Sequence, residues 1–244
     1  TLIIGAAVLS QQIDYLQSRR IGLHPDQVLM IRDFGQGTIL RQFDAMRQVL
    51  NQHPDVVDAT RTTLLPGVRM GENMLLNNNT VRYLPITSGF VETFGLQLLS
   101  GEVFATPGKP EHFVVSRSTV DIMGWTPTEA VGQQITLYYN NRGDGNMGIP
   151  PGIIAGVVED FQIDSLRRPI GPIVMPTWNN DGFYGATPFI KLQTYDIQAT
   201  LASIEEVWHE FLPDSPFEHL FLDEVFAQLY RAEIRLSRVS STLA

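Results

Sequence analysis

The chain has 244 residues, a hydrophobic content of 43% and a net charge of −9 at neutral pH. A chain of this size and composition can bury one large core or two modest ones. Its negative charge argues against a general nucleic-acid binder, which needs a basic surface to replace phosphate counterions, and against docking on anionic lipid. Because the chain has no cysteine, thiol chemistry, disulfides and zinc sites built from cysteine are also excluded.

Residues 1–24 are expected to form a stalk helix that continues a truncated transmembrane helix. Residues 2–9 are almost wholly apolar, and residues 11–20 continue the pattern in polar form. The apolar run is too short to span a membrane, and it lacks the basic flank of a signal peptide. The alternative is an ordinary buried helix. One apolar stripe at helical spacing follows the expected stalk, formed by Leu9, Ile13 and Leu16.

Two strand–helix–strand units lie near the two ends of the chain. The first is expected at Val28–Ile31, Thr38–Gln52 and Val56–Leu65. The second is expected at Phe189–Leu192, Ile197–Phe211 and Phe217–Leu222. Apolar residues recur at a period near 3.6 in both helices. The two units predict an α+β fold with a split βαβ, ferredoxin-like (porter-like) subdomain made of residues 25–65 and 187–222.

The intervening residues 66–186 are expected to form an inserted, strand-rich mixed α/β subdomain, because they are rich in glycine, proline and short strands. Residues 67–79 are interpreted as a loop or hairpin tip, and Asn140–Pro151 as a flexible loop. Thr126 and Glu129 have the spacing of a capping box. Strands are predicted at Val81–Pro85, Phe113–Ser116, Gln134–Tyr139, Ile153–Val158 and Pro172–Met175.

Four strings in this chain carry a resemblance to a known family. They are VVEDF with SLRRPIGPIVM inside Gly152–Pro176, FGLQLLSGEVF at Phe94–Phe104, VVSRSTVDIMGW with AVGQQI at Val114–Ile135, and FLDEVFAQLYRAEIRLSRV at Phe221–Val239. Together they resemble the extracytoplasmic domain of MacB-type, FtsX-like ABC transporter permeases, in which strings of the form GVVxDFxxxSLxxxIxP and FGxxLxxGRxF recur. Glu102 stands where that family usually has a basic residue. The motif positions are Gly95, Gly101, Phe104, Gly132, Gly156, Val157, Val158, Asp160, Phe161 and Pro172.

The last segment, residues 223–244, is expected to be a second stalk helix paired with the first. Its alternative is a terminal helix packed on the domain's own core, which periodicity alone does not distinguish. The near-heptad stripe consists of Leu222, Val225, Leu229, Ala232, Leu236, Val239 and Leu243.

The sequence shows no pattern for catalysis, cofactor binding or metal binding. Its five histidines are scattered without a paired spacing, and no G-x-S-x-G or phosphate-loop setting is present. Glu159 and Asp160 are adjacent, so on a strand they would point to opposite faces. We therefore expect no catalytic, cofactor-binding or metal-binding residue.

The resemblance implies a non-catalytic domain of an ABC permease in the inner membrane, facing the periplasm or extracytoplasmic space. Such a domain couples ATP hydrolysis by a separate subunit to export or mechanical work. The implied partners are the ABC ATPase subunit, a second copy or paired permease domain, and an extracytoplasmic protein. Two alternatives are a domain that recognises a lipid, peptide or drug between its subdomains, and a hydrolase, for which the sequence offers no nucleophile.

Overall fold

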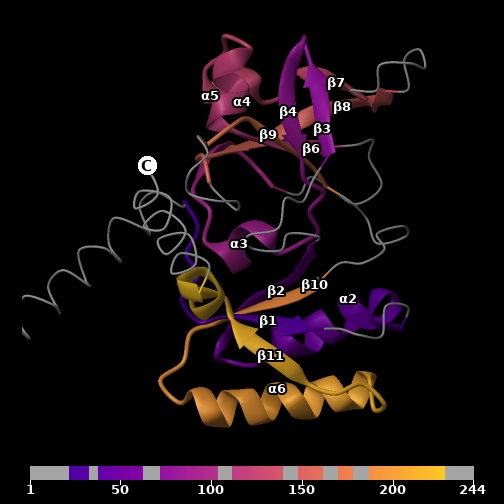
Figure 1. Cartoon of the computed structure of the whole chain (residues 1–244), viewed down its shortest axis with the longest axis vertical. Coiled ribbons are helices and arrows are strands. Elements are labelled where there is room, and N and C mark those ends of the chain that lie inside the picture. The colour runs from indigo at the N-terminus through magenta and orange to yellow at the C-terminus, as the bar shows by residue number, and fades with distance from the viewer. Residues whose placement is uncertain are drawn as a thin grey trace, which may run out of the picture. The chain divides into compact units, whose positions relative to one another are not determined.

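A computed structural model of the chain describes residues 22–32, 38–62, 72–103, 112–139, 148–161, 170–177 and 187–228. They form a mixed α/β fold with two β-sheets (Figure 1). They also divide into two compact units. Unit 1 contains the described residues among 22–24, 72–83 and 95–176, and unit 2 contains those among 25–71, 84–94 and 177–228. None of the helices in these ranges is long and apolar enough to cross a membrane.

Unit 2 is built on a four-stranded antiparallel sheet in the order β11-β1-β10-β2. The central strands β1 and β10 come from opposite ends of the sequence and pair with Leu29 opposite Ile190. Helix α2 connects β1 to β2, and α6 connects β10 to β11. The bounds are β1 (Val28–Arg32), α2 (Thr38–Leu50), β2 (Val56–Thr62), β10 (Thr187–Leu192), α6 (Ile197–Phe211) and β11 (Glu218–Phe221).

The two faces of this sheet are covered by different helices. The apolar stripes of α2 and α6 pack on one face, where Phe43 and Trp208 are 1% exposed. On the other face, the ring of Phe189 lies 5.1 Å from that of Phe94 in α3 (Phe90–Phe94). Figure 1 shows α3 and α6 on opposite sides of the sheet. The segment 84–94 therefore belongs to unit 2, whereas the sequence had placed it within an unbroken insert from 66 to 186.

The outer edge of β2 is covered by side chains. Arg47 of α2 donates to the Ala59 carbonyl oxygen at 2.6 Å, and its Nη2 donates to Asp58 Oδ2 at 2.8 Å. The Thr87 hydroxyl donates to the Arg61 carbonyl oxygen at 2.9 Å and accepts from the Arg61 amide at 3.2 Å. Because these contacts occupy backbone groups of an edge strand, they hinder pairing with another chain there.

Unit 1 contains a seven-stranded sheet in the order β5-β8-β6-β9-β4-β3-β7. Strand β7 also pairs with β8, so six of the strands form a closed ring around a core that includes Phe113, Ile154 and Val174. The strands are β3 (Glu72–Leu76), β4 (Asn79–Tyr83), β5 (Leu98–Gly101), β6 (His112–Ser116), β7 (Gln134–Tyr139), β8 (Gly148–Val158) and β9 (Ile173–Pro176). The helices are α4 (Arg117–Ile122) and α5 (Pro127–Ala130).

Three strand assignments in unit 1 differ from the sequence-based expectation. Strand β3 lies in the segment interpreted as a loop or hairpin tip, and β5 was not predicted. Strand β8 begins at Gly148, inside the predicted loop 140–151. Strand β3 forms a hairpin with β4, and the start of β8 pairs with β7, the strand that precedes it. Strand β5 pairs with β8, which is distant in sequence, so local composition does not reveal its partner. The capping box at Thr126 and Glu129 is confirmed at the start of α5.

Candidate functional site

Strand β8 is where the motif residues of unit 1 gather. One edge pairs in parallel with β6, and the register shifts between Ile154 and Gly156, so Ala155 is an extra residue at a β-bulge. The other edge pairs first with β7, where Gln134 faces Ile153, and then with β5. The exchange of partners on this edge therefore occurs at the bulge.

Two motif glycines allow the backbones of β5 and β8 to approach closely at the point where β8 changes its pairing partner. Gly101 has a φ of 76°, and a Cβ there would overlap the Ala155 carbonyl oxygen. A Cβ on Gly156 would lie 2.5 Å from the Glu102 carbonyl oxygen. Gly132 differs. Its φ of 87° is a left-handed backbone conformation that glycine adopts readily, but an added Cβ there would have open space around it. The first two glycines thus serve close packing, and the third serves a turn.

Asp160 caps helix α4 across the sheet. Its Oδ1 accepts from the Ser118 amide at 2.8 Å, and its Oδ2 accepts from the Ser118 hydroxyl. Because β6 and β8 are parallel, both carboxyl ends lie at one edge, so a residue after β8 reaches the helix that follows β6. Neighbouring Glu159 accepts from Arg117 Nε at 2.9 Å, and this hydrogen bond lowers the pKa of Glu159. Both acids of the VVEDF string therefore hold α4 in place.

The Pro172–Ile173 segment joins the same region through hydroxyl groups. Ser116 Oγ accepts from the Ile173 amide at 3.0 Å, and Thr119 Oγ1 donates to the Ile173 carbonyl oxygen at 2.9 Å. The Pro172 carbonyl oxygen accepts from the Arg82 amide at 2.9 Å. Two of the four motif strings, in Gly152–Pro176 and Val114–Ile135, thus meet around α4.

Residues 22–24 enter unit 1 at this junction. Gly22 has a φ of 65°, and a Cβ there would overlap the Asp160 carbonyl oxygen. Leu23 is fully buried, and a Cβ on Gly95 would lie 2.9 Å from His24 Cδ2. The motif residues Gly95 and Asp160 therefore contact residues 22–24 directly and fix their position in unit 1. The sequence identified Gly95 only as a motif position, so it did not predict this contact.

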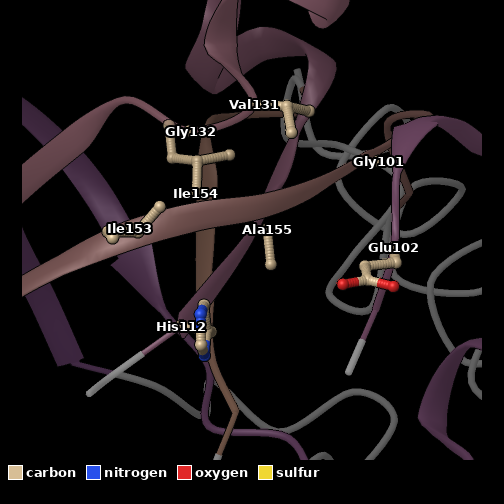
Figure 2. A pocket seen from close by; sticks show the side chains of 8 residues that line it. All are labelled: Gly101, Glu102, His112, Val131, Gly132, Ile153, Ile154 and Ala155. Carbon is tan, nitrogen blue, oxygen red and sulfur yellow. The ribbon is translucent and has the colours of Figure 1, made fainter. Parts of the chain in front are cut away.

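An open pocket of about 420 Å³ lies beside the bulge (Figure 2). The pocket was not predicted from the sequence, although the glycine positions and the unusual Glu102 were visible signals. Its lining includes Gly101, Glu102, His112, Gly132, Ile153 and Ala155.

The other predicted residues are either at least half-buried in one of the two units or lie outside the described residues. Leu222 is buried and Val225 is half-buried in a helical stretch over 222–228, with Phe226 4% exposed. The motif residues Val157, Val158 and Phe161 are buried in unit 1. Outside the described residues lie Leu9, Ile13, Leu16, Phe104, Leu229, Leu236 and Val239.

The described ranges contain no group of three or more histidine, aspartate or glutamate side chains placed to hold a metal ion. The polar groups of the junction bind one another, as the contacts of Asp160, Glu159 and Ser116 show. This arrangement supports fixed packing of α4 against the sheet.

Protein-family models and curated proteins give no match to the chain. Among solved structures, it is similar to the periplasmic region of MacB from Actinobacillus actinomycetemcomitans, with a TM-score of 0.51 and 16% identity over 87% of this chain and 95% of that one. A domain of a protein described as a permease from Porphyromonas gingivalis has a TM-score of 0.49 and 19% identity over 81% and 91%. The extracellular domain of the ABC-type transporter YknZ from Gram-positive bacteria has a TM-score of 0.40 and 12% identity over 72% and 88%.

The chain therefore has the fold of the MacB periplasmic region. The fold predicted from the ordered motif strings is confirmed in this respect.

Proposed function

We propose that this chain is a non-catalytic extracytoplasmic domain of an ABC transporter permease in the inner membrane. In this proposal it couples ATP hydrolysis by a separate ATPase subunit to export or mechanical work. The supporting observation is the fold shared with the MacB periplasmic region, together with motif residues that meet at one junction. Its proposed partners are the ATPase subunit, a second copy or paired permease domain, and an extracytoplasmic protein.

We propose a split βαβ, ferredoxin-like arrangement for unit 2. The order β11-β1-β10-β2, with helices after β1 and β10, supports this assignment. In this proposal the strand-rich part of unit 1 within 66–186 is inserted between the two halves, and residues 22–24 of unit 1 precede the first half. Segment 84–94 is the part of that stretch that packs on the unit 2 sheet.

Coupling is proposed to use the segments that lead to the two stalk helices. Gly22 packs on Asp160 in unit 1, so a displacement of the preceding helix would act on the α4 junction. Leu222 and Phe226 are buried, so the following helix would act on the core of unit 2. The proposed pairing of the stalks involves Leu9, Ile13, Leu16, Leu229, Leu236 and Val239.

The location is tested with a single cysteine in the full-length permease. Tyr195 is 111% exposed, and the chain has no cysteine of its own, so Tyr195→Cys adds one accessible thiol to this domain. We expect a membrane-impermeant maleimide to label it in intact cells, with any outer membrane permeabilised. The control Ala59→Cys, at a position with 0% exposure, should label only after denaturation. Labelling of Tyr195→Cys only after lysis would contradict the proposal.

The coupling route is tested with Gly22→Ala in the same permease. The added methyl group must displace the Asp160 backbone, so we expect ATP turnover to persist while the export phenotype is lost. Gly124→Ala is the matched control, because Gly124 has a positive φ but open space, lies outside the pocket and should keep export. Normal export by a folded Gly22→Ala permease would reject this route.

For the C-terminal stalk, Leu229→Glu and Leu236→Glu should uncouple transport and leave the isolated domain folded.

A further inference from the structure

We infer that the pocket beside the β8 bulge is a docking site for a basic, partly apolar loop of an extracytoplasmic partner protein. This inference rests on the proposed function, which includes such a partner. It adds the surface and the chemistry that the partner must present. Three properties of the pocket support it: its shape, its fixed floor and its charge.

The shape favours a protein partner over a small molecule. The volume of about 420 Å³ is within the range of ligand pockets, roughly 300–1,000 Å³, but the pocket is open to solvent. A small ligand usually buries about 70–90% of its surface, which an open hollow does not provide. An apolar side chain on a protein loop can enter while the surrounding loop covers the rim. Ile153, 37% exposed, offers an apolar wall for such a side chain.

The floor of the pocket is fixed by backbone hydrogen bonds. The Glu102 amide donates to the Ala155 carbonyl oxygen at 2.9 Å, and the Gly132 amide donates to the Ile154 carbonyl oxygen at 2.8 Å. The Ile154 amide donates to the Gln133 carbonyl oxygen at 2.9 Å. A floor held in this way loses little conformational freedom when a partner binds. Because these polar groups are already bonded, the floor favours an apolar group.

The charge of the rim favours a basic partner. Glu102 is exposed, and it forms no ion pair with the residues that the structure describes. Figure 2 shows Glu102 and His112 on different sides of Ala155. No lysine or arginine is among the described residues that line the pocket, and the whole chain carries −9. A lysine or arginine next to the inserted apolar side chain would therefore meet a complementary charge.

The test is a nuclear magnetic resonance titration of the 244-residue chain with two hexapeptides, GKLWKG and GEWLEG. The reporters are the amide signals of Gly101, Gly132 and Ala155, which line the pocket. We expect GKLWKG to shift these signals in a saturable way, and GEWLEG to bind at least about tenfold more weakly. Addition of salt should reduce the difference between the peptides, because screening weakens exposed charge pairs.

Three variants sharpen the test. Glu102→Arg should reverse the preference between the peptides, and Glu102→Gln should remove most of it while changing the fold less. Ile153→Ala should weaken both peptides. The matched control is Glu206→Arg, which makes the same charge change on an exposed position of α6 in unit 2 and should leave the preference unchanged.

Two results would overturn the docking inference. One is that neither peptide shifts the lining amides, or that the Glu102 variants bind as the wild type does. The other is saturation of the same amides by tetraphenylphosphonium at a lower concentration than by either peptide, which would indicate a small-molecule site. The cysteine-labelling test of location does not depend on these results, so failure of docking and failure of the proposed function are distinguishable.

Discussion

The cores of the two units are specified in different ways. In unit 2, α2 and α6 place apolar residues of helical period on a four-stranded sheet, and their core includes Met46, Ile204 and Trp208. In unit 1, single polar contacts join residues far apart in sequence, such as Asp160 and Ser118, which are 42 positions apart. The comparison teaches that the recognisable motif residues of unit 1 serve as structural joints, whereas the comparable long-range polar contacts of unit 2, such as that between Thr200 and Asp55, lie outside the motif strings.

Two of the chain's three tryptophans lie one in each unit, so each unit can be followed in a variant whose other two tryptophans are replaced by phenylalanine. Trp208 is buried in unit 2, and Trp125 packs against the core of unit 1. If the units differ as described, substitutions in one should change its own unfolding more than that of the other. The following predictions run from the largest expected effect to the smallest.

The largest effect is expected for Trp208→Ala in unit 2. Trp208 is 1% exposed, and its Nε1 donates to the Ser215 carbonyl oxygen at 3.1 Å. Removal of a buried aromatic side chain costs about 3–5 kcal/mol in the free energy of unfolding. In urea denaturation, circular dichroism should show the early loss of unit 2, while the fluorescence of Trp125 in unit 1 should change at a higher urea concentration. A change below about 1 kcal/mol would contradict the assigned core.

The next effect is expected for Gly101→Ala in unit 1. The left-handed φ of 76° and the overlap with Ala155 should together lower the free energy of unfolding by about 2–4 kcal/mol. Gly124→Ala is the matched control, because Gly124 has a φ of 72° with nothing within 4 Å of the added methyl group. Urea denaturation monitored by Trp125 fluorescence measures both. Equal losses for the two variants would show that close packing at the bulge is unimportant.

A smaller effect is expected for Asp160→Ala, which removes the cap of α4. Loss of a capping side chain costs about 0.5–2 kcal/mol. In the wild type the Ser118 amide donates to Asp160 Oδ1, so hydrogen exchange at this amide should be faster in Asp160→Ala. Ser118→Ala retains this amide contact and should lose less stability. Unchanged hydrogen exchange at Ser118 in Asp160→Ala would show that Asp160 does not cap α4.

The smallest effect is expected from acid, and each unit has its own carboxylate for this test. Hydrogen bonding to Arg117 lowers the pKa of Glu159 in unit 1, and hydrogen bonds from Thr200 and Thr194 lower the pKa of Asp55 in unit 2. A lowered folded-state pKa stabilises the fold above the unfolded-state value. That contribution is lost as pH falls from the usual values of 4.5 for glutamate and 3.8 for aspartate through the folded-state values.

Two substitutions separate these contributions. Glu159→Gln should flatten the acid dependence of unit 1 unfolding, and Asp55→Asn should flatten that of unit 2. The Glu159–Arg117 pair has side-chain exposures of 38% and 41%, so its effect should be small and should decrease with salt. Urea denaturation between pH 7 and pH 3, at low and high salt, provides the measurement. If the acid dependence of unfolding is unchanged in both variants, it must come from titratable groups other than Glu159 and Asp55.

The sequence by itself determined the parts of the fold that depend on local pattern. Helical periodicity placed α2 and α6 within two residues of their observed ends, and Thr126 with Glu129 marked the start of α5. These features depend on residues within one or two turns of each other, so a single segment contains the information. The motif strings also predicted the MacB-type fold without any knowledge of how their residues meet.

Only the tertiary structure decided the contacts between distant segments. It paired β5 with β8, extended β8 back to Gly148, and placed α3 on the sheet of unit 2. It also showed that Gly101 allows a close backbone approach, that Asp160 caps α4, and that a pocket lies beside the bulge. These contacts depend on the register of paired strands and on the distance between backbones, which the composition of one segment does not encode.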